Sequence, residues 1–186
     1  DGVTMRELAA KSGVTPKTLY HQFGNKEKLL HSAVEERFRH TYQAIDDQEI
    51  AKGIDRLLFI IEAVADSTRK NIDYAKSLAP LLGTRRSTTF AQIRIATYRK
   101  AIAQIDEEGD FVDWIDTEVI TAMIYRQVNP LYLNWWCDDD SEYALDEISK
   151  LDICLILRSI TTGYTHKIAT KTIQDLQNNA KNFFTS

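Results

Sequence analysis

The sequence predicts an all-α protein with a small N-terminal helix-turn-helix domain and a larger helical domain after it. Apolar residues recur at helical spacing along most of the 186 residues, and no segment alternates apolar and polar residues for long enough to build a sheet. Only three prolines interrupt the chain, which favours long helices. An apolar content of 44% is ample for a buried core.

The first expected helix begins after Thr4. Thr4 and Glu7 have the spacing of a capping box, in which each side chain accepts a hydrogen bond from the backbone N–H of the other residue. Gly13 can adopt the left-handed conformation that often ends a helix. The pattern therefore predicts a short helix and a tight turn of the kind that joins the two helices of a helix-turn-helix.

The second expected helix has start and stop signals of its own. Thr15 is suited to the N-cap, and Pro16 stands at the first helical position, where its missing N–H has no consequence. Gly24 can end the helix, and Asn25 can cap the next one. Two short capped helices thus lie between residues 3 and 25, followed by the start of a third.

The second helix has one apolar and one polar side. Leu19 and Phe23 share a face, and the remaining positions carry groups that can bind DNA. Lysine and threonine can hydrogen-bond to base edges, while tyrosine and histidine can reach phosphates or a thymine methyl. The polar side carries Lys17, Thr18, Tyr20 and His21.

A phosphate site is expected at the start of the third helix, because Lys26 and Lys28 stand beside its positive N-terminal end. Capped helices joined by a glycine turn also occur in ordinary helical bundles, and a lone surface histidine is usually only solvated. DNA binding is the interpretation that these signals favour when taken together.

The charge distribution agrees with this interpretation. The first 40 residues carry a net charge of +2 and the remainder −6, within a total of −4. The basic end of the chain is therefore the end that carries the motif. The two cysteines show no metal or disulfide spacing. No stretch suits a transmembrane helix or a signal peptide, and we expect a cytoplasmic protein without membrane contact.

The run VTMRELAAKSGVTPKTLYHQFGNKEKLL resembles the N-terminal domain of the TetR (tetracycline repressor) family of bacterial transcriptional regulators. The likeness includes Gly13-Val14, Thr18-Leu19-Tyr20, Phe23 and Asn25-Lys26, and beyond Phe38 only length and helical character agree. The resemblance implies that Thr4 and Arg6 touch phosphate and base, that residues 16–18 enter the major groove, and that Tyr20, His21 and Lys26 hold the backbone. The DNA-binding residues expected in all are Thr4, Arg6, Thr15, Pro16, Lys17, Thr18, Tyr20, His21 and Lys26.

The family domain has a further helix before this motif, and we expect that helix to precede Asp1. Residues 1–45 are then the DNA-binding domain with its connecting helix, and residues 46–186 the effector-binding and dimerisation domain. The remaining helices are expected at 26–45, 50–70, 72–82, 88–108, 116–136 with a break or kink near Pro130, 145–167 and 170–184.

In the larger domain the resemblance implies a small-molecule pocket and a dimer interface. Arg94 would suit an anionic ligand, or it is a surface arginine whose stem crosses the core. The expected pocket residues are Phe59, Tyr74, Phe90, Arg94, Tyr98, Tyr125 and Gln127, for each of which plain core packing is the alternative. A four-helix bundle between two copies would use Trp136, Leu151, Leu155, Ser159 and Thr162.

The expected function is that of a ligand-responsive regulator, most simply a repressor, that binds a palindromic operator in double-stranded DNA as a homodimer. No cofactor, metal ion or catalytic residue is expected. The alternative is a DNA-binding family member that is architectural or controlled by a protein partner, with no small-molecule effector. A helical-bundle enzyme is the remote alternative, since Glu27–His31 and Glu36–His40 lack the Glu-x-x-His spacing of di-metal bundles.

Overall fold

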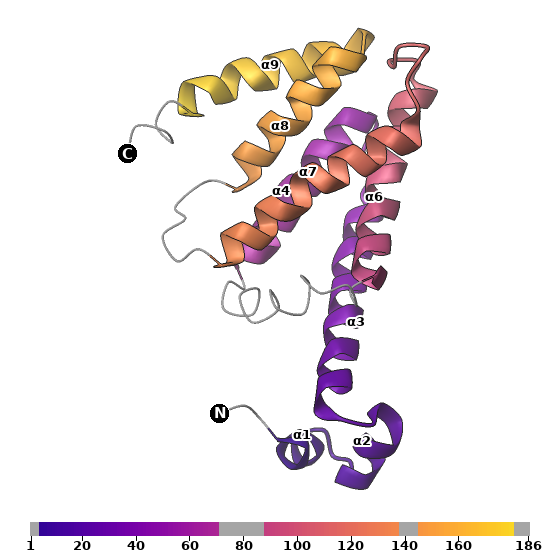
Figure 1. Cartoon of the computed structure of the whole chain (residues 1–186), viewed down its shortest axis with the longest axis vertical. Helices are drawn as coiled ribbons and strands as arrows, with labels where there is room; N and C mark the ends of the chain where they lie inside the picture. Colours follow the sequence, from indigo (N-terminus) through magenta and orange to yellow (C-terminus); the bar gives the residue numbers. More distant parts are fainter. Residues whose placement is uncertain (1–3, 71–87, 138–144, 181–186) are drawn as a thin grey trace. The chain divides into compact units, whose positions relative to one another are not determined.

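The computed structural model describes residues 4–70, 88–137 and 145–180, and these residues are almost entirely helical (Figure 1), which confirms the predicted fold class. The helix expected at 72–82 lies outside the described residues. The helices are α1 (Met5–Lys11), α2 (Pro16–Phe23), α3 (Lys26–Asp46), α4 (Gly53–Arg69), α6 (Thr88–Glu107), α7 (Thr117–Cys137), α8 (Leu145–Ile160) and α9 (Gly163–Ala180).

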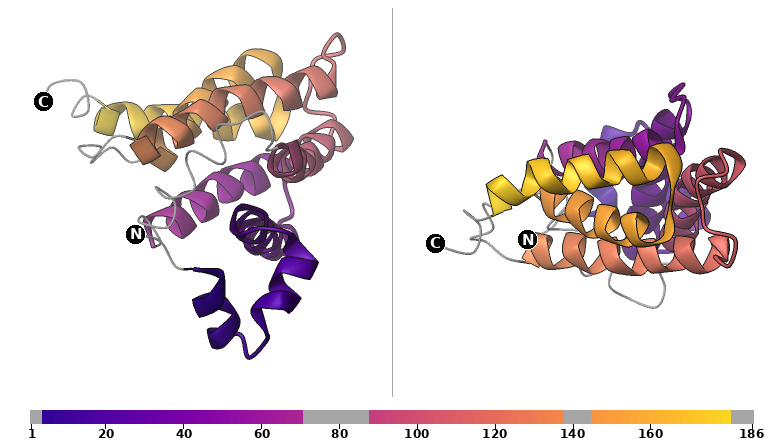
Figure 2. Two further views of the ribbon diagram at one scale, coloured as in Figure 1. Left: turned by 60° about the horizontal axis from the view of Figure 1, so that its bottom comes forward. Right: turned by 90° about the horizontal axis from the view of Figure 1, so that it is seen from above.

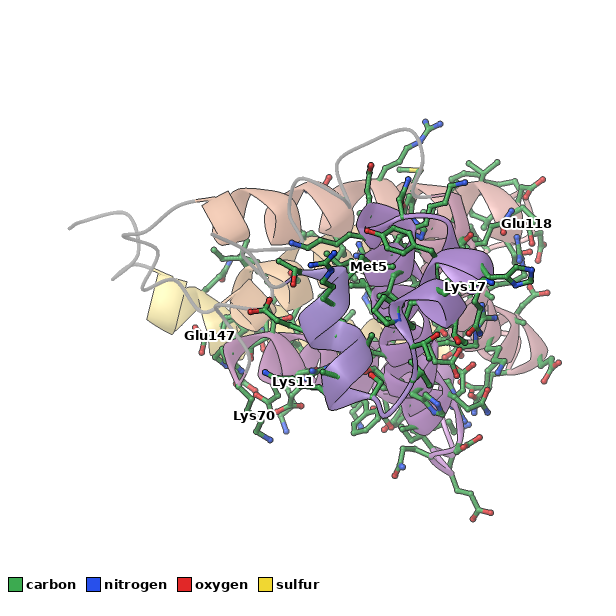
Figure 3. All side chains as sticks on the ribbon, turned by 90° about the horizontal axis from the view of Figure 1, so that it is seen from below. Met5, Lys11, Lys17, Lys70, Glu118 and Glu147 are labelled. Carbon is green, nitrogen blue, oxygen red and sulfur yellow. The ribbon has the colours of Figure 1, made fainter. Side chains whose placement is uncertain are left out.

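The chain divides into two compact units, Asp1–Gln43 and Ala44–Ser186. Helix α3 contributes residues to both units, because it begins at Lys26 and ends at Asp46. In the first unit, α1 and α2 are joined by a short turn through Gly13, whose φ is +67°. Met5, Ala9 and Leu19 form its buried core, against which Leu8, Phe23 and Leu29 pack. Figure 3 views this unit end-on and labels Met5 in that core.

The second unit is a bundle in which α4 packs against α6, α8 and α9, while α7 packs between α6 and α8. The right-hand view of Figure 2 shows α7, α8 and α9 side by side. The largest fully buried side chains come from four of these helices, so the core runs through the whole unit. They are Ile54, Leu57, Ile60, Ile61, Phe90, Tyr98, Ile102, Ile105, Ile124, Val128, Ile153 and Leu157.

The single helix expected over 145–167 is wrong, because α8 ends at Ile160 and α9 begins at Gly163. Buried Asp110 causes the break. Its backbone carbonyl accepts the N–H of Thr162 at 2.6 Å, and its carboxylate accepts the N–H of Thr165 at 2.6 Å. Gly163 takes a φ of +57° in between, where a side chain would be strained. The tail helix expected at 170–184 is consequently the second part of α9 as far as Ala180, and residues 181–184 lie outside the described residues.

Of the break or kink expected near Pro130, the break is absent, since α7 is continuous from Thr117 to Cys137. A proline inside a helix removes one backbone hydrogen bond and costs about 3 kcal/mol. The packing of α7 against both α6 and α8 offsets that cost.

The end of α3 is held inside the second unit by side chains of α4 and α6. Lys100 forms an ion pair with Asp46, the last residue of α3. Arg56 donates to the carbonyl of Gln48 at 3.2 Å and to the Gln104 side chain at 3.0 Å. Gln104 in turn donates to the carbonyl of Ile50 at 3.1 Å. The segment after α3 is therefore tied to two helices of the larger unit.

Candidate nucleic-acid interface

The two caps predicted for the helix-turn-helix are formed. The backbone N–H of Thr4 donates to the Glu7 carboxylate at 2.7 Å, and the Glu7 N–H donates to the Thr4 hydroxyl at 3.3 Å. The hydrogen bond from the Thr4 backbone holds the pKa of Glu7 below its ordinary value. At the start of α2, the Thr18 N–H donates to the Thr15 hydroxyl at 3.1 Å. These local bonds fix where α1 and α2 begin.

The side of α2 that carries the predicted DNA contacts is open. Leu19 is buried against α1 and Phe23 is half-buried, which turns the rest of the helix outward. In Figure 3, Lys17 lies on the side of α2 away from α1. Every predicted contact residue on this helix and its cap is exposed: Thr15, Pro16, Lys17, Thr18, Tyr20 and His21.

The structure also exposes Gln22, which the sequence interpretation omitted. Gln22 is polar and precedes the packed Phe23, so helical periodicity alone could have placed it on the open side. By contrast, the hydroxyl of Thr18 is already engaged, since it lies 2.9 Å from the hydroxyl of Thr15. Any contact of Thr18 with a base competes with this bond.

The start of α3 has the geometry expected of a phosphate site, with one difference. Asn25 caps the helix by accepting the N–H of Lys28 at 2.8 Å, and the Lys28 side chain is exposed. Lys26 is half-buried, and its charge contributes to the lowered pKa of Glu7 after the larger effect of Thr4. Lys26 therefore acts electrostatically on a carboxylate of α1.

The two predicted contact residues at the start of α1, the N-cap Thr4 and Arg6, are both exposed. Arg6 extends a guanidinium that can donate to a phosphate or a guanine edge. The Thr4 hydroxyl donates to the Glu7 carboxylate at 2.9 Å, so it serves the capping box in this structure.

The residues predicted to line a ligand pocket fall into three groups. Phe59 lines an open groove of about 490 Å³ on α4, together with Glu62, Ala63, Asp66, Ser67 and Lys70. Phe90, Arg94 and Tyr98 are buried along one face of α6, so the surface position considered for Arg94 is excluded by an exposure of 6%. Tyr125 is half-buried, Gln127 donates to Asp152 at 2.9 Å, and Tyr74 lies outside the described residues.

The predicted dimer residues on α8 lie away from the core of their own chain. Leu155 is half exposed, Ser159 is exposed and Leu151 is half-buried. Thr162 is exposed between α8 and α9, and the side chain of Trp136 lies outside the described part. The sequence interpretation missed Val119 and Met123, which are exposed on α7. Their four-residue spacing was the signal that places both on one helix face.

The described residues offer neither a metal site nor a membrane-spanning helix. Within residues 4–70, 88–137 and 145–180, no three His, Cys, Asp or Glu side chains gather closely enough to bind a metal ion. Over the same residues, no helix is both long and apolar enough to cross a membrane.

Comparison with known proteins supports a DNA-binding role for the first unit. The model of the tetR family of bacterial regulatory proteins matches residues 1–33. These residues contain α1, α2 and the first part of α3, including the exposed side of α2. No curated protein matches the sequence.

Solved structures extend the fold likeness along the chain. A TetR-family regulator from Rhodococcus sp. is 18% identical, with a TM-score of 0.61 over 84% of this chain and 88% of that one. The repressor QsdR of R. erythropolis is 20% identical, with a TM-score of 0.57 over 86% of each chain. A TetR-family regulator from Marinobacter aquaeolei is 16% identical, with a TM-score of 0.55 over 92% and 89%. At such identities these matches show a shared fold.

The sequence match to residues 1–33 and the fold matches along the chain concern the same class of protein, the TetR-family regulators. Residues 1–33, with their capped helix-turn-helix, are thus similar to the DNA-binding domain of the tetR family of bacterial regulatory proteins, and the described chain shares its fold with solved TetR-family regulators.

Proposed function

We propose that this regulator is a homodimeric repressor, which binds a palindromic operator and releases it when a small molecule binds the larger unit. The observation that carries the proposal is helix α3, which starts beside the DNA-binding helices and ends inside the larger unit. A change in the larger unit can act on the DNA-binding unit through this one helix.

The DNA contacts proposed are those of α2 and its neighbours. The exposed side of α2 would enter the major groove, as the second helix of such motifs does. Arg6 precedes α2 in the sequence and Lys28 follows it. Both are exposed cations and would bind phosphates. Thr4, Thr15 and Thr18 would act mainly through their capping bonds.

The dimer proposed uses the outward faces of α7 and α8. Ile120, Ile124 and Val128 turn one side of α7 into the core, and Val119 and Met123 are left on the other. On α8, Leu155 is exposed in the same way. The bond between Gln127 and Asp152 joins the two helices, so these apolar faces belong to neighbouring elements. Burial against the same faces of a second copy would remove them from water, as in a two-fold interface.

The dimer is tested by sedimentation of the full-length protein. Leu155→Lys should shift the dimer toward monomer, because it places a charge in the apolar contact. Lys171→Glu changes an exposed charge on α9 and should leave the dimer intact, which makes it the matched control. An unchanged dimer in the Leu155→Lys protein would exclude α8 from the interface.

The effector site proposed lies between α4 and α6. Arg94 carries a permanent charge into the interior, at helical spacing from the buried Phe90 and Tyr98 on the same helix. The groove beside Phe59 opens on α4, which packs against α6. Aromatic walls with a few polar groups are typical of small-molecule pockets, and a cation favours a ligand that has an anionic group.

We propose that release of the operator follows from the ion pair and the hydrogen bonds that hold the end of α3 and the segment after it. Because Lys100, Gln104 and Arg56 connect this end to α6 and α4, a ligand that moves either helix shifts α3. The protein then has two conformational states that differ in their affinity for the ligand. The free energy of operator binding can change by no more than the difference between the ligand's binding free energies for these two states.

The experiment begins with a thermal-shift screen of hydrophobic and anionic compounds on the full-length protein. A ligand at 100 times its dissociation constant adds about 2.7 kcal/mol of stability. Each compound that stabilises the protein is then added to the protein bound to its operator, and fluorescence anisotropy measures the change in affinity. We expect affinity to fall. Stabilising ligands that leave operator affinity unchanged would refute the coupling and favour control by a protein partner.

A matched pair of variants tests the path of the coupling. Gln104→Ala removes two of the bonds that hold the segment after α3, so the ligand should lower operator affinity less than in the natural protein. Gln92→Ala changes an exposed glutamine on the same helix and should preserve the full response. Equal responses in the two variants would show that these ties do not transmit the signal.

A further inference from the structure

The direction of each side chain on α2 follows from its two packed residues. At about 100° per residue, Leu19 and Phe23 point about 40° apart, toward the core of the first unit. His21 points about opposite to their mean direction, with Lys17 about 40° to one side and Thr18 about 60° to the other. Tyr20 and Gln22 point about 100° away from His21, one on each flank.

This arrangement matches the shape of a major groove, which has base edges on its floor and a phosphate backbone along each wall. The side chain that points straight away from the core reaches the floor, and the flanking side chains reach the walls. His21 occupies the central direction and is exposed. Tyr20 and Gln22 are exposed on the two flanks.

Lys17 and Thr18 point closest to the direction of His21, and they differ in whether they take part in the cap of α2. The hydroxyl and the backbone N–H of Thr18 are both bonded to Thr15, at 2.9 Å and 3.1 Å. Lys17 is exposed and takes no part in the cap. Lys17 and His21 are four residues apart, which is about 6 Å along the helix and comparable with two base-pair steps of about 3.4 Å.

We propose that His21 and Lys17 read base pairs on the floor of the major groove, while Tyr20 and Gln22 contact the phosphates of the two strands. Thr18 then maintains the cap. This rests on the DNA binding set out above and reassigns His21, which the family resemblance places on the backbone. Lys17 suits a guanine edge, and the imidazole of His21 can donate to or accept from a base beside it.

The test uses the full-length protein and DNA half-sites. The preferred half-site is first selected from random DNA, and each of its base pairs is then substituted in turn. For every fragment, affinity is measured with the natural protein, His21→Ala and Gln22→Ala. Both replaced side chains are exposed, and a urea melt of each variant verifies that the fold is retained.

For His21→Ala we expect the preference at one base pair to fall by about 5- to 150-fold, the range that a specific base contact supplies. For Gln22→Ala we expect every fragment to bind more weakly by the same factor. Its salt dependence should not change, because the amide carries no charge. His21→Gln should shift the lost preference toward adenine, with which glutamine forms a bidentate pair.

The opposite outcome for His21→Ala would overturn the assignment. If that variant keeps every base preference and binds all fragments equally less tightly, His21 contacts phosphate and not bases. A natural protein that selects no sequence at all would instead refute the DNA-binding function on which the assignment rests, so the two failures are distinguishable.

Discussion

The junction between α8 and α9 allows a quantitative test of why the chain breaks there. A methyl group at Gly163 would overlap Oδ1 of Asp110, far inside van der Waals contact. Asp110 is buried and its carboxylate accepts the N–H of Thr165. Gly163→Ala must therefore displace this carboxylate, in addition to forcing alanine into a φ of +57°.

The expected loss has two parts. Alanine in the left-handed region costs about 1–2 kcal/mol. Losing a hydrogen bond to a charged acceptor costs about 1.5–3 kcal/mol. Gly163→Ala should thus lower the free energy of unfolding by about 2.5–5 kcal/mol in total.

Gly109 supplies the matched control. Its φ is +72°, and a methyl group there would meet nothing within 4 Å. Gly109→Ala should show only the backbone part of the loss, about 1–2 kcal/mol. Both variants are unfolded in urea at one protein concentration, since oligomerisation would make stability depend on it. Equal losses in the two variants would refute the role given to Asp110.

Three further predictions concern single side chains. Thr15→Ala removes the cap of α2 and should destabilise the first unit by about 1 kcal/mol, and Thr15→Asn should restore the stability. Hydrogen exchange at the Thr18 amide measures this loss, and an unchanged exchange rate in Thr15→Ala would refute the prediction. Burial raises the pKa of Cys154 to about 11, so in a Cys137→Ser protein the folded thiol should react slowly with iodoacetamide at neutral pH, and rapid labelling would contradict this. Hydrogen bonds from Arg99 lower the pKa of Glu118 in the folded protein. The ion pair between these two residues should therefore stabilise the fold at neutral pH, and this stabilisation should be lost as the pH falls through the folded-state pKa of Glu118. Glu118→Gln should remove that part of the acid dependence of the urea midpoint, and an identical pH profile would show that the pair contributes nothing.

The parts of the fold that follow from local signals could be predicted from the sequence. Thr4, Thr15 and Asn25 each cap a helix through bonds within three residues, and Gly13 and Gly24 adopt positive φ at the turns. These bonds depend on neighbours in the sequence, so spacing alone reveals them.

The break between α8 and α9 could not be predicted in the same way. Its cause is Asp110, which lies more than 50 residues before Thr165 and is bonded to it only in the folded chain. Locally, the apolar run around Ile160 continues at helical spacing. Pro130 shows the reverse case, because its local signal for a break is overridden by packing.

In the candidate site, too, some features follow from the local sequence and others only from the folded structure. The exposed side of α2 follows from the spacing of Leu19 and Phe23. The engagement of Thr18 by Thr15 and the effect of Lys26 on the pKa of Glu7 do not follow from spacing. The burial of Arg94 is likewise a tertiary result, since an arginine on a helix can lie across the core or within it.

The central claim is that the exposed side of α2 binds DNA in two copies held by one dimer. The most direct measurement is selection of binding sites from random DNA by the full-length protein, repeated with Lys17→Ala. We expect an inverted repeat with half-sites about one helical turn or somewhat more apart, and altered bases in the Lys17→Ala selection. Recovery of the same sequence by both proteins, or of single half-sites without symmetry, would contradict it.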